Sequence, residues 1–353
     1  MPGACQSRDP ARSQEGESAT LHHERNLFCL PGQERFFLFI RKENSIMVSE
    51  NRSLLRNANM ETNMKYDLLP LEEGDEDYID HKIEEYDESV VPPDPADADE
   101  SIVLKIADDD GNVVAGLIFD IGSKIMWLHV LWVDERYRRQ GFASALIRKA
   151  ERTAREKNCC LSIVGSFDFQ AKPFYEKHGY TVYGVVEDWP KGHCNYALRK
   201  QLDRLSPDHV PSKPQKESKY EVEVGNEDDL KAICDGLDAY NQTQIPDERV
   251  NETLGKKITN KNGEMIAAYT ASIDEWNAAY PSVWVEERYR KQGIGTYLLR
   301  ELERELKEKG AYVMLVWPSD WQAGFFVKQG FTVCTVAEDC PKGHCYYCMK
   351  KVI

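Results

Sequence analysis

The chain contains one long motif twice, and this repeat limits the folds that it can adopt. Residues 131–147 read LWVDERYRRQGFASALI, and residues 283–299, which lie 152 positions later, read VWVEERYRKQGIGTYLL. The match continues downstream, where EDWPKGH at 187–193 aligns with EDCPKGH at 338–344 after the loss of one residue. Self-similarity over such a length indicates two copies of one structural unit.

The repeat also predicts how the 353 residues are divided into domains. We predict a first domain at residues 65–202 and a second domain at residues 219–353. Residues 203–218 are rich in proline, serine and charge, which is typical of a linker. Residues 1–64 have no copy in the second half, and their polar composition predicts a mostly disordered N-terminal extension.

Hydrophobic periodicity within one copy predicts the fold class. The order is a helix, three strands, a helix, a strand, a helix and two strands, which indicates an α/β fold with a mixed sheet and helices packed on it. The elements expected in the first copy are a helix at 75–86, strands at 101–107, 113–120 and 126–133, a helix at 143–157, a strand at 161–164, a helix at 171–178, and strands at 181–186 and 194–199. The first helix of the second copy is expected at 227–240.

Charge and hydropathy exclude several functional classes. The net charge of −15 argues against a general nucleic-acid binder, which needs a basic surface. No apolar run approaches the ~20 residues that span a bilayer, and the N-terminus does not resemble a signal peptide, so we expect a soluble cytoplasmic protein without a membrane partner. Residues 72–100 hold fourteen Asp or Glu against one Lys. We interpret them mainly as solvated surface, although they could attract cationic substrates.

The ten cysteines are expected to be reduced thiols. Cys340, His344, Cys345 and Cys348 lie close together in the sequence, and alone they could suggest a metal site. In the aligned segment of the first copy only Cys345 has a cysteine counterpart, Cys194. Because a metal that organised the fold would be expected in both copies, we predict no metal site.

The chemistry-bearing segment is the one that joins the apolar strand to the following helix. It reads DERYRRQGFAS from Asp134 to Ser144, so that a glycine turn feeds a helix N-terminus. The first amides of a helix have no partner within the helix, and the helix dipole adds roughly +0.5 charge there. Arg138 and Arg139 add further positive charge, and Gly141 lets the backbone approach a ligand. The segment therefore predicts an anion site suited to a pyrophosphate.

This segment resembles the acetyl-CoA signature R-x-x-G-x-G/A of the GNAT N-acetyltransferases. It is present as RRQGFA at 138–143 and as RKQGIG at 290–295, and FYEKHGY at 174–180 is similar to a later element of that family. The resemblance extends over roughly 270 residues, nearly all of both copies. It differs from the dinucleotide fingerprint and from the Walker phosphate loop.

The resemblance implies two tandem GNAT-like acyl-CoA N-acyltransferase domains that use acetyl-CoA as acyl donor. In such enzymes the pyrophosphate lies on the loop amides, and the pantetheine arm pairs with the preceding strand. The cofactor-binding residues implied for the first copy are Leu131, Val133, Arg138, Arg139, Gln140, Gly141, Ala143 and Ser144. Those implied for the second copy are Val283, Val285, Arg290, Lys291, Gln292, Gly293, Gly295 and Thr296.

Acyl transfer to an amine needs a general base for the amine and a general acid for the leaving thiolate. Tyr175 occupies the position at which the family places its acid, although a half-buried aromatic at a helix start is an alternative. His129 is the candidate base because an imidazole titrates near neutral pH, although a strand histidine is more often a satisfied core residue. Glu187, Asp188 and His193 either border the substrate site or only shape the last hairpin.

The two copies differ at both candidate catalytic positions. Phe326 aligns with Tyr175, and Pro281 aligns with His129. We therefore predict that the first domain is catalytic, and that the second binds acyl-CoA weakly or serves as a structural partner.

Three functions are consistent with these patterns. The first is acetylation of a small-molecule amine, the second is acetylation of a protein lysine or N-terminus, and the third is a non-catalytic acyl-CoA-binding scaffold. The expected partners are acetyl-CoA and an amine acceptor. The expected assembly is a monomer whose tandem domains form a pseudo-dimer, or a homodimer.

Overall fold

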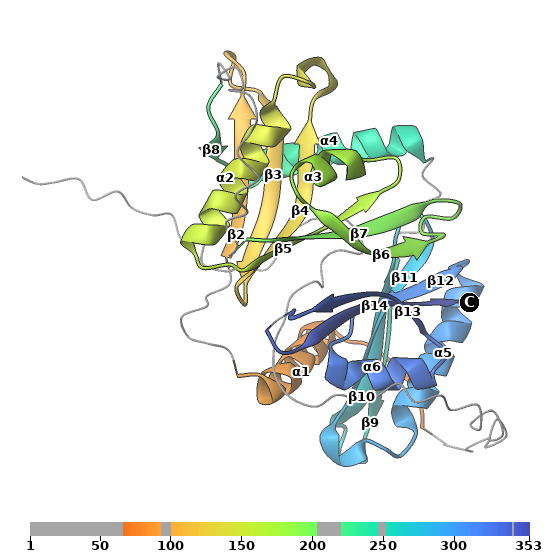
Figure 1. The fold of residues 1–353 in the computed structure, drawn as a ribbon. Coiled ribbons are helices and arrows are strands. Elements are labelled where there is room, and N and C mark those ends of the chain that lie inside the picture. Colours follow the sequence, from red (N-terminus) through yellow and green to blue (C-terminus); the bar gives the residue numbers. More distant parts are fainter. Residues whose placement is uncertain (1–65, 93–99, 203–219, 246–251, 341) are drawn as a thin grey trace, which may run out of the picture.

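The computed structural model contains two seven-stranded mixed sheets, one above the other in Figure 1. The structure describes residues 66–92, 100–202, 220–245, 252–340 and 342–353. The predicted extension at 1–64 and the predicted linker at 203–218 lie outside these residues. The mixed α/β class and the two similar units predicted from the repeat are confirmed.

The first sheet has the strand order β6-β7-β5-β4-β3-β2-β8. Only the β4–β5 pair is parallel, and the other neighbours are antiparallel. Its strands are β2 (Glu100–Ala107), β3 (Val113–Gly122), β4 (Ile125–Val133), β5 (Leu161–Phe167), β6 (Thr181–Glu187), β7 (Cys194–Gln201) and β8 (Glu223–Val224). The strand predicted at 161–164 is therefore longer than the apolar run alone indicated.

The second sheet repeats this topology with the order β1-β9-β10-β11-β12-β14-β13, and β11–β12 is its parallel pair. Its strands are β1 (Leu69–Pro70), β9 (Glu252–Thr259), β10 (Met265–Ile273), β11 (Ala278–Val285), β12 (Val313–Val316), β13 (Thr332–Glu338) and β14 (Cys345–Val352). We call β2–β7 with their helices α2 and α3 the first half, and β9–β14 with α5 and α6 the second half.

The helices follow the predicted order. They are α1 (Asp75–Val90), α2 (Phe142–Glu156), α3 (Lys172–Lys177), α4 (Glu227–Gln244), α5 (Ile294–Glu308) and α6 (Asp320–Lys328). In α2 the residues Leu146, Ile147 and Ala150 are buried against the sheet, as their spacing predicted. In α5 Leu298, Leu299 and Leu302 take the same place.

The two copies exchange their first helices. The chain segment that opens the second copy, α4, packs on the first sheet, where Ile233 and Cys234 join a buried cluster with Ile118 and Val130. The segment that opens the first copy, α1, packs on the second sheet, where Ile79 contacts Trp284. In Figure 1 the orange helix α1 accordingly lies among the blue strands, and the teal helix α4 lies behind the yellow ones.

Matching ion pairs hold the start of each exchanged helix. Lys105 of β2 lies 2.9 Å from the carboxylate of Asp229 in the first turn of α4. Lys257 of β9 lies 2.7 Å from the carboxylate of Asp75 in the first turn of α1. Burial acts to raise the pKa of Asp75, but the hydrogen bonds from Lys257 and from the Glu72 amide, together with the charge of Lys257, outweigh it and lower that pKa. The acidic first turns also complement the helix dipoles.

Two glycines allow α4 to lie close to the first sheet. A Cβ added to Gly116 of β3 would lie 2.1 Å from Ile233, and a Cβ added to Gly236 of α4 would lie 2.3 Å from the Trp132 indole. A glycine inside a helix is otherwise unfavourable by about 1 kcal/mol. The close approach of Trp132 explains why one is present here.

The C-terminal ends of the exchanged helices also form equivalent contacts. Gln170 donates from Nε2 to Oδ1 of Asn241 in α4, at 3.0 Å. Gln322 and Trp321 both donate to Oδ1 of Asp87 in α1, at 2.8 and 2.9 Å. Asp87 is thus a carboxylate at the place that an amide occupies in the other copy, and burial raises its pKa to about 7.

The domain boundary predicted at 203–218 stays a prediction, but segments on each side of it pack on the sheet of the other side. β1 and α1 precede that division and belong to the second sheet, whereas β8 and α4 follow it and belong to the first sheet. Sequence order alone could not reveal this, because the apolar face of a helix does not specify which sheet it covers.

The two halves also meet directly through their last hairpins. Gly184 of β6 lies against Thr335 of β13, where an added Cβ would approach the threonine side chain to 2.4 Å. The Tyr312 hydroxyl donates to the carbonyl oxygen of Asp188, at 3.1 Å. A buried cluster that includes Phe167, Trp189 and Tyr280 spans this contact. The two halves therefore pack as an intramolecular pair.

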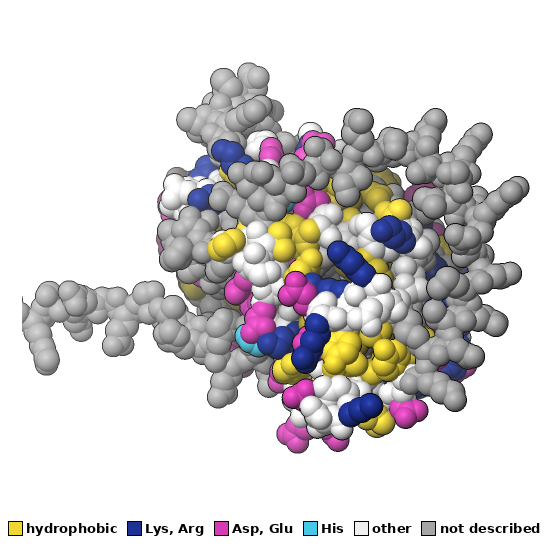
Figure 2. All heavy atoms as spheres, turned by 90° about the horizontal axis from the view of Figure 1, so that it is seen from below, with side chains coloured by type: hydrophobic (Ala, Val, Ile, Leu, Met, Phe, Trp, Pro, Cys, Tyr) yellow, Lys and Arg dark blue, Asp and Glu magenta, His cyan; other side chains and the backbone are white. Residues whose placement is uncertain are grey.

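Figure 2 shows the molecule from below the view of Figure 1, with acidic and basic side chains interspersed among hydrophobic ones on the described surface. Several exposed charges are paired along α5, where Arg304 contacts Glu308 at 2.8 Å and Lys307 contacts Glu303 at 2.9 Å. Such pairs add only a few tenths of a kcal/mol each.

We predict that Asp87→Asn stabilises the protein at pH 8 but not at pH 4. An unfolded aspartate ionises near pH 3.8 and folded Asp87 near pH 7, so stability falls as the pH rises through this window. The amide keeps an oxygen for Trp321 and Gln322 and removes this penalty, which is at most about 4 kcal/mol. Thermal unfolding at several pH values measures the effect.

The matched variant Asn241→Asp provides the control for this prediction. It introduces a carboxylate at the equivalent place in α4, and it should destabilise the protein more at pH 8 than at pH 5. A gain from Asp87→Asn that does not grow with pH would contradict the assignment of the buried carboxylate.

Candidate functional site

The candidate site begins where strands β4 and β5 separate. These strands pair only from Ile125 to Leu128 with Leu161 to Val164. Beyond Leu128, β4 continues to Val133 along β3 but not along β5. The divergence opens the sheet in its middle and leaves an edge of β4 facing a cavity.

The segment after β4 has the geometry of an anion-binding turn. A short 3-10 helix at Glu135–Tyr137 leads to Arg139 with φ of 62° and to Gly141 with φ of 92°, and α2 starts at Phe142. No side chain caps α2. A Cβ on Gly141 would meet no atom within 4 Å, so lack of space does not explain the glycine. The positive φ explains it.

The arginine and glutamine of this turn brace the backbone. Arg138 donates from Nε to the carbonyl oxygen of Val133, at 3.1 Å, and its guanidinium lies 4.8 Å from the ring centre of Tyr240 in α4. Gln140 donates from Nε2 to the carbonyl oxygen of Arg136, at 3.3 Å. The side chain of Gln140 thus stabilises the turn itself.

The helix α3 covers the start of α2. The Ser144 hydroxyl lies 3.0 Å from Nε2 of His178 at the end of α3. Tyr175 of α3 is buried against Phe174 and Tyr180. Burial raises the pKa of the Tyr175 hydroxyl well above its ordinary value, so this group keeps its proton at neutral pH.

His129 lies at a β-bulge in β4. Val130 pairs with Ile118 and Leu128 pairs with Phe119, which leaves His129 as the extra residue between them. Its Nε2 lies 2.8 Å from Oδ2 of Asp120 in β3. A carboxylate at one ring nitrogen favours the tautomer that carries its proton there.

These residues surround a single cavity of about 450 Å³, which we call the main cavity. Both candidate catalytic residues, Tyr175 and His129, line it. So do the predicted cofactor-binding residues of the first copy other than Gln140, namely Leu131, Val133, Arg138, Arg139, Gly141, Ala143 and Ser144. Glu187, Asp188 and His193 do not line it, although the neighbouring Trp189 does.

Part of the wall of the main cavity comes from outside the first half. Helix α4 contributes Leu237, Tyr240 and Asn241. The turn between β10 and β11 of the second half contributes Asp274, Glu275 and Trp276, followed by Tyr280 of β11.

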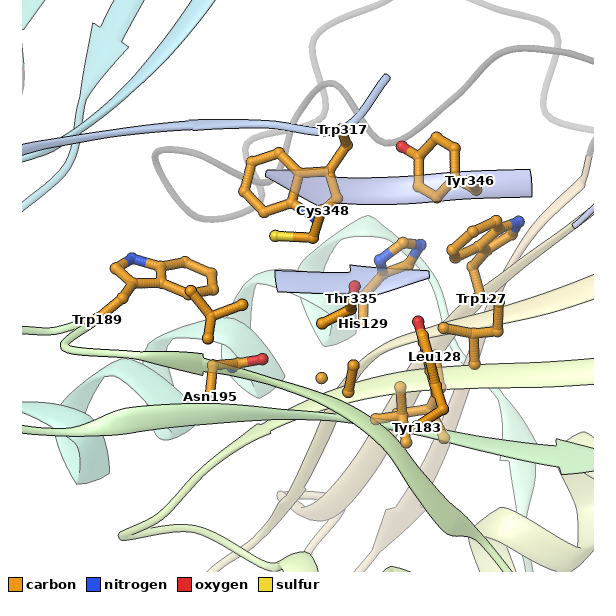
Figure 3. Close-up of a pocket in the computed structure, with 15 residues that line it drawn as sticks. Trp127, Leu128, His129, Tyr183, Trp189, Asn195, Trp317, Thr335, Tyr346 and Cys348 are labelled. Carbon is orange, nitrogen blue, oxygen red and sulfur yellow. The ribbon is translucent and has the colours of Figure 1, made fainter. Parts of the chain in front are cut away.

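A second, smaller space of about 90 Å³ lies between the two halves (Figure 3). His129, Trp189 and Asn195 line both spaces. Trp127 and Tyr346 face one another across the contact between halves, with ring centres 5.5 Å apart. The bulged histidine therefore lies where the main cavity meets the contact between halves.

The second half repeats the turn but not the two candidate catalytic residues. Lys291 has φ of 60° and Gly293 has φ of 88°, and Arg290 donates from Nε to the carbonyl oxygen of Val285 at 2.8 Å. The remaining predicted residues, Val283, Gln292, Gly295 and Thr296, lie in the equivalent strand, turn and first helical turn. The pairing of β10 with β11 has no bulge, and its register places Pro281 opposite Ala271.

Comparison with known proteins identifies the family. Residues 65–180 and 228–331, more than half of the chain, match the model of the acetyltransferase (GNAT) family. The chain belongs to this family. Because each copy is matched, the protein contains two tandem GNAT regions, and it is an N-acetyltransferase.

Individual relatives resemble part of the chain. Blasticidin-S acetyltransferase of Streptomyces morookaense is 40% identical over 95 residues, which cover 26% of this chain and 68% of that protein. Acetyltransferase Atu2258 of Agrobacterium fabrum is 31% identical over 99 residues, which cover 28% and 72%. A solved acetyltransferase structure from Bacillus cereus is 34% identical and covers 38% of this chain and 96% of its own, with a TM-score of 0.37.

Within the described part of this GNAT chain, no helix is both long and apolar enough to cross a membrane. Within the same residues, no three or more His, Cys, Asp or Glu side chains are grouped so that they could hold a metal ion.

Sequence reasoning missed two features of the candidate site. Asp120, the partner of His129, aligns with Ser272, so the carboxylate and the imidazole are both absent from the second copy. The β10–β11 turn was also missed, although Asp274, Glu275 and Trp276 replace the plain Gly-Ser-Lys turn at 122–124. A search for neighbouring positions at which the two copies differ together, rather than for positions at which they match, would have pointed to Asp120 and to the β10–β11 turn.

We predict that Asp120→Asn lowers kcat of this acetyltransferase by roughly 10- to 100-fold, part of the ~10²–10⁴-fold that a positioned base supplies. An amide in place of the carboxylate no longer fixes which nitrogen of His129 carries the proton. The rate of acetyl transfer to one fixed amine, together with the unfolding temperature, measures the effect. Asp110→Asn in the exposed β2–β3 turn is the control, and an unchanged kcat for Asp120→Asn would remove this role.

Proposed function

We propose that the protein transfers an acetyl group from acetyl-CoA to a primary amine of a small molecule, by direct attack in a ternary complex. The observation that supports this is the main cavity, which connects the anion-binding turn with Tyr175 and His129. The relative named as an acetyltransferase of blasticidin-S supports a small-molecule acceptor.

In this proposal the turn before α2 binds the diphosphate of acetyl-CoA. The amides at the start of α2 and the charges of Arg138 and Arg139 attract the anion. The pantetheine arm follows the edge of β4 that β5 leaves open, past Leu131 and Val133. The carbonyl oxygen of Val133 accepts from Arg138, so the arm contacts other backbone groups of this edge.

The reaction then needs two proton transfers. The amine nitrogen attacks the thioester carbon and passes its proton to Nδ1 of His129, whose Nε2–H is held by Asp120. The carbon–sulfur bond breaks, and the thiolate of coenzyme A takes the proton of the Tyr175 hydroxyl. That hydroxyl carries its proton at neutral pH, so it is in the form that can donate.

The proposal assigns catalysis to the first half. Phe326 and Pro281 replace Tyr175 and His129 in the second copy, which leaves that copy without either proton-transfer group. The second half would bind acetyl-CoA weakly or act as a structural partner. The direct packing of the two halves supports a monomer that is itself a pseudo-dimer, and the cytoplasmic location stays a prediction.

The pair Gly141→Asp and Gly293→Asp tests the assignment of the cofactor turns. Both glycines have positive φ and open space at Cβ, so the two substitutions impose similar strain and differ only in the half that they change. A carboxylate among the α2 amides repels the diphosphate. Gly141→Asp should therefore weaken acetyl-CoA binding to the first half at least about tenfold and abolish transfer.

Calorimetric titration with acetyl-CoA and an assay of coenzyme A release provide the measurements for this pair. Gly293→Asp should change at most the number of acetyl-CoA molecules bound and retain transfer. If the wild type binds no acetyl-CoA, the proposed function is wrong. If Gly293→Asp instead abolishes transfer, the division of labour is reversed.

Tyr175→Phe tests the acid. Phenylalanine fills nearly the same volume, so folding and acetyl-CoA affinity should be retained, whereas kcat should fall by roughly 100-fold or more. Phe326→Tyr in the second half is the matched control and should leave kcat unchanged. A Tyr175→Phe enzyme with the kcat of the wild type would exclude the tyrosine as the proton donor.

A further inference from the structure

The charged residues that line the main cavity come from two separate places. The positive ones, Arg138 and Arg139, belong to the turn before α2. The negative ones, Asp274 and Glu275, belong to the β10–β11 turn of the second half. No other Asp, Glu, Lys or Arg among the described residues lines the cavity. A ligand that fills it therefore meets positive charge from one half and negative charge from the other.

The acidic turn is built by a difference between the two copies. In the first half β3 and β4 are joined by Ser123 and Lys124 alone, and the extra residue of the hairpin is the bulged His129. In the second half β10 and β11 pair without a bulge, and the residues 274–277 form a longer turn. The longer turn carries its side chains into the main cavity.

Asp274 is fixed within this turn. Its Oδ1 accepts from the backbone amides of Trp276 and Ala278, at 2.9 and 2.8 Å, and its Oδ2 accepts from the Tyr280 hydroxyl at 2.5 Å. It is 1% exposed. Burial raises the pKa of Asp274 to about 6 against the effect of these neutral donors, so the carboxylate is mostly ionised at neutral pH.

Aromatic rings surround the acidic turn. Phe167 and Trp189 come from the first half, and Trp276 and Tyr280 come from the second half, and all four line the main cavity. Phe167 contacts Trp276 edge to face, with ring centres 5.1 Å apart, and contacts Trp189 at 5.2 Å. Carboxylates next to aromatic faces favour organic cations, which gain both ionic and cation–π attraction.

We infer that the β10–β11 turn of the second half is the acceptor subsite of the first half's active site, and that it takes a small amine carrying a second, cationic group. This inference rests on the proposed function, and it names the class of acceptor. The second cationic group lies against Asp274 and Glu275, between the aromatic rings. The amine that reacts lies nearer His129 and Tyr175.

The two cationic groups of the acceptor have different roles, and this explains why they lie in different places. The attacking amine must be neutral, so it cannot be the group that carboxylates hold in its charged form. A second cation can be held there without being consumed. The same carboxylates repel the phosphates of acetyl-CoA, so the two substrates are directed to different parts of the cavity.

The turn also gives the second half a role that does not depend on its own catalysis. The equivalent turn of the first half presents Ser123 and Lys124, which offer neither a carboxylate nor an aromatic ring. Among the described residues, an acidic turn of this kind thus lines the site of the first half and has no counterpart in the β3–β4 turn.

The test compares acceptors that differ only in the second charge. Diamines from 1,3-diaminopropane to 1,6-diaminohexane, and 4-aminobutylguanidine, are each compared with the amino alcohol of the same length. With the full-length protein, the best dicationic acceptor should have a kcat/KM about tenfold or more above its amino alcohol. Glu275→Gln should lower this preference roughly tenfold through KM, and Asp274→Asn should act in the same direction.

Two controls separate this inference from the proposed function. Acetyl-CoA affinity, measured by calorimetry, should be the same in the wild type, Glu275→Gln and Asp274→Asn, because the proposal places the cofactor on the turn before α2 and not on the β10–β11 turn. Glu264→Gln, in the exposed turn between β9 and β10, removes a charge outside the cavity and should retain the preference for dicationic acceptors.

Each outcome decides between the two proposals. A wild type that binds no acetyl-CoA overturns the proposed function. Three results in a wild type that binds acetyl-CoA overturn only the acceptor subsite. They are equal acetylation of amino alcohols and diamines, no acetylation of any dicationic acceptor, and a preference for a peptide amine over all of them. A full preference in both carboxylate variants would also overturn it.

Discussion

The exchange of the two N-terminal helices is the contact on which the rest of the structure depends. Each sheet has an apolar face that the helices of its own half do not cover. The helix that covers this face comes from the other copy. The ion pairs Lys105–Asp229 and Lys257–Asp75 fix the start of each exchanged helix. Separating the halves would expose both sheets, so we expect the tandem copies to fold as one cooperative unit rather than as two independent domains.

The geometry of the candidate site follows from the same exchange. Because α4 lies on the first sheet, Tyr240 stacks under Arg138 and Asn241 binds Gln170 at the wall of the main cavity. The anion-binding turn proposed for the first half is therefore braced by a helix that follows it in the chain by about one hundred residues. The direct contact between the halves then brings the β10–β11 turn to the same cavity. The site belongs to the pair of halves and not to either alone.

Much of this fold could be predicted from the sequence, because the repeat and the apolar periodicity are local properties. The strand at 126–133, the glycine turn and the helix that begins at Phe142 are encoded within about thirty residues, and so are their counterparts in the second copy. The exchange could not be predicted, because apolar periodicity shows that α1 and α4 each have a face to bury but not which sheet buries it. The pairing of His129 with Asp120 was likewise hidden, since it depends on a bulge that shifts the strand register by one residue.

The differences between the copies form one connected change rather than independent losses. In the first copy the extra residue of the central hairpin is a bulge that turns His129 toward Asp120 and the main cavity. In the second copy the hairpin is regular, Pro281 lies in the strand, and the extra length appears in the turn that carries Asp274. A hairpin of fixed length cannot form both the bulge and the longer turn. Two copies allow both features to exist in one molecule, and their packing brings both to one cavity, which a single copy of this unit could not achieve.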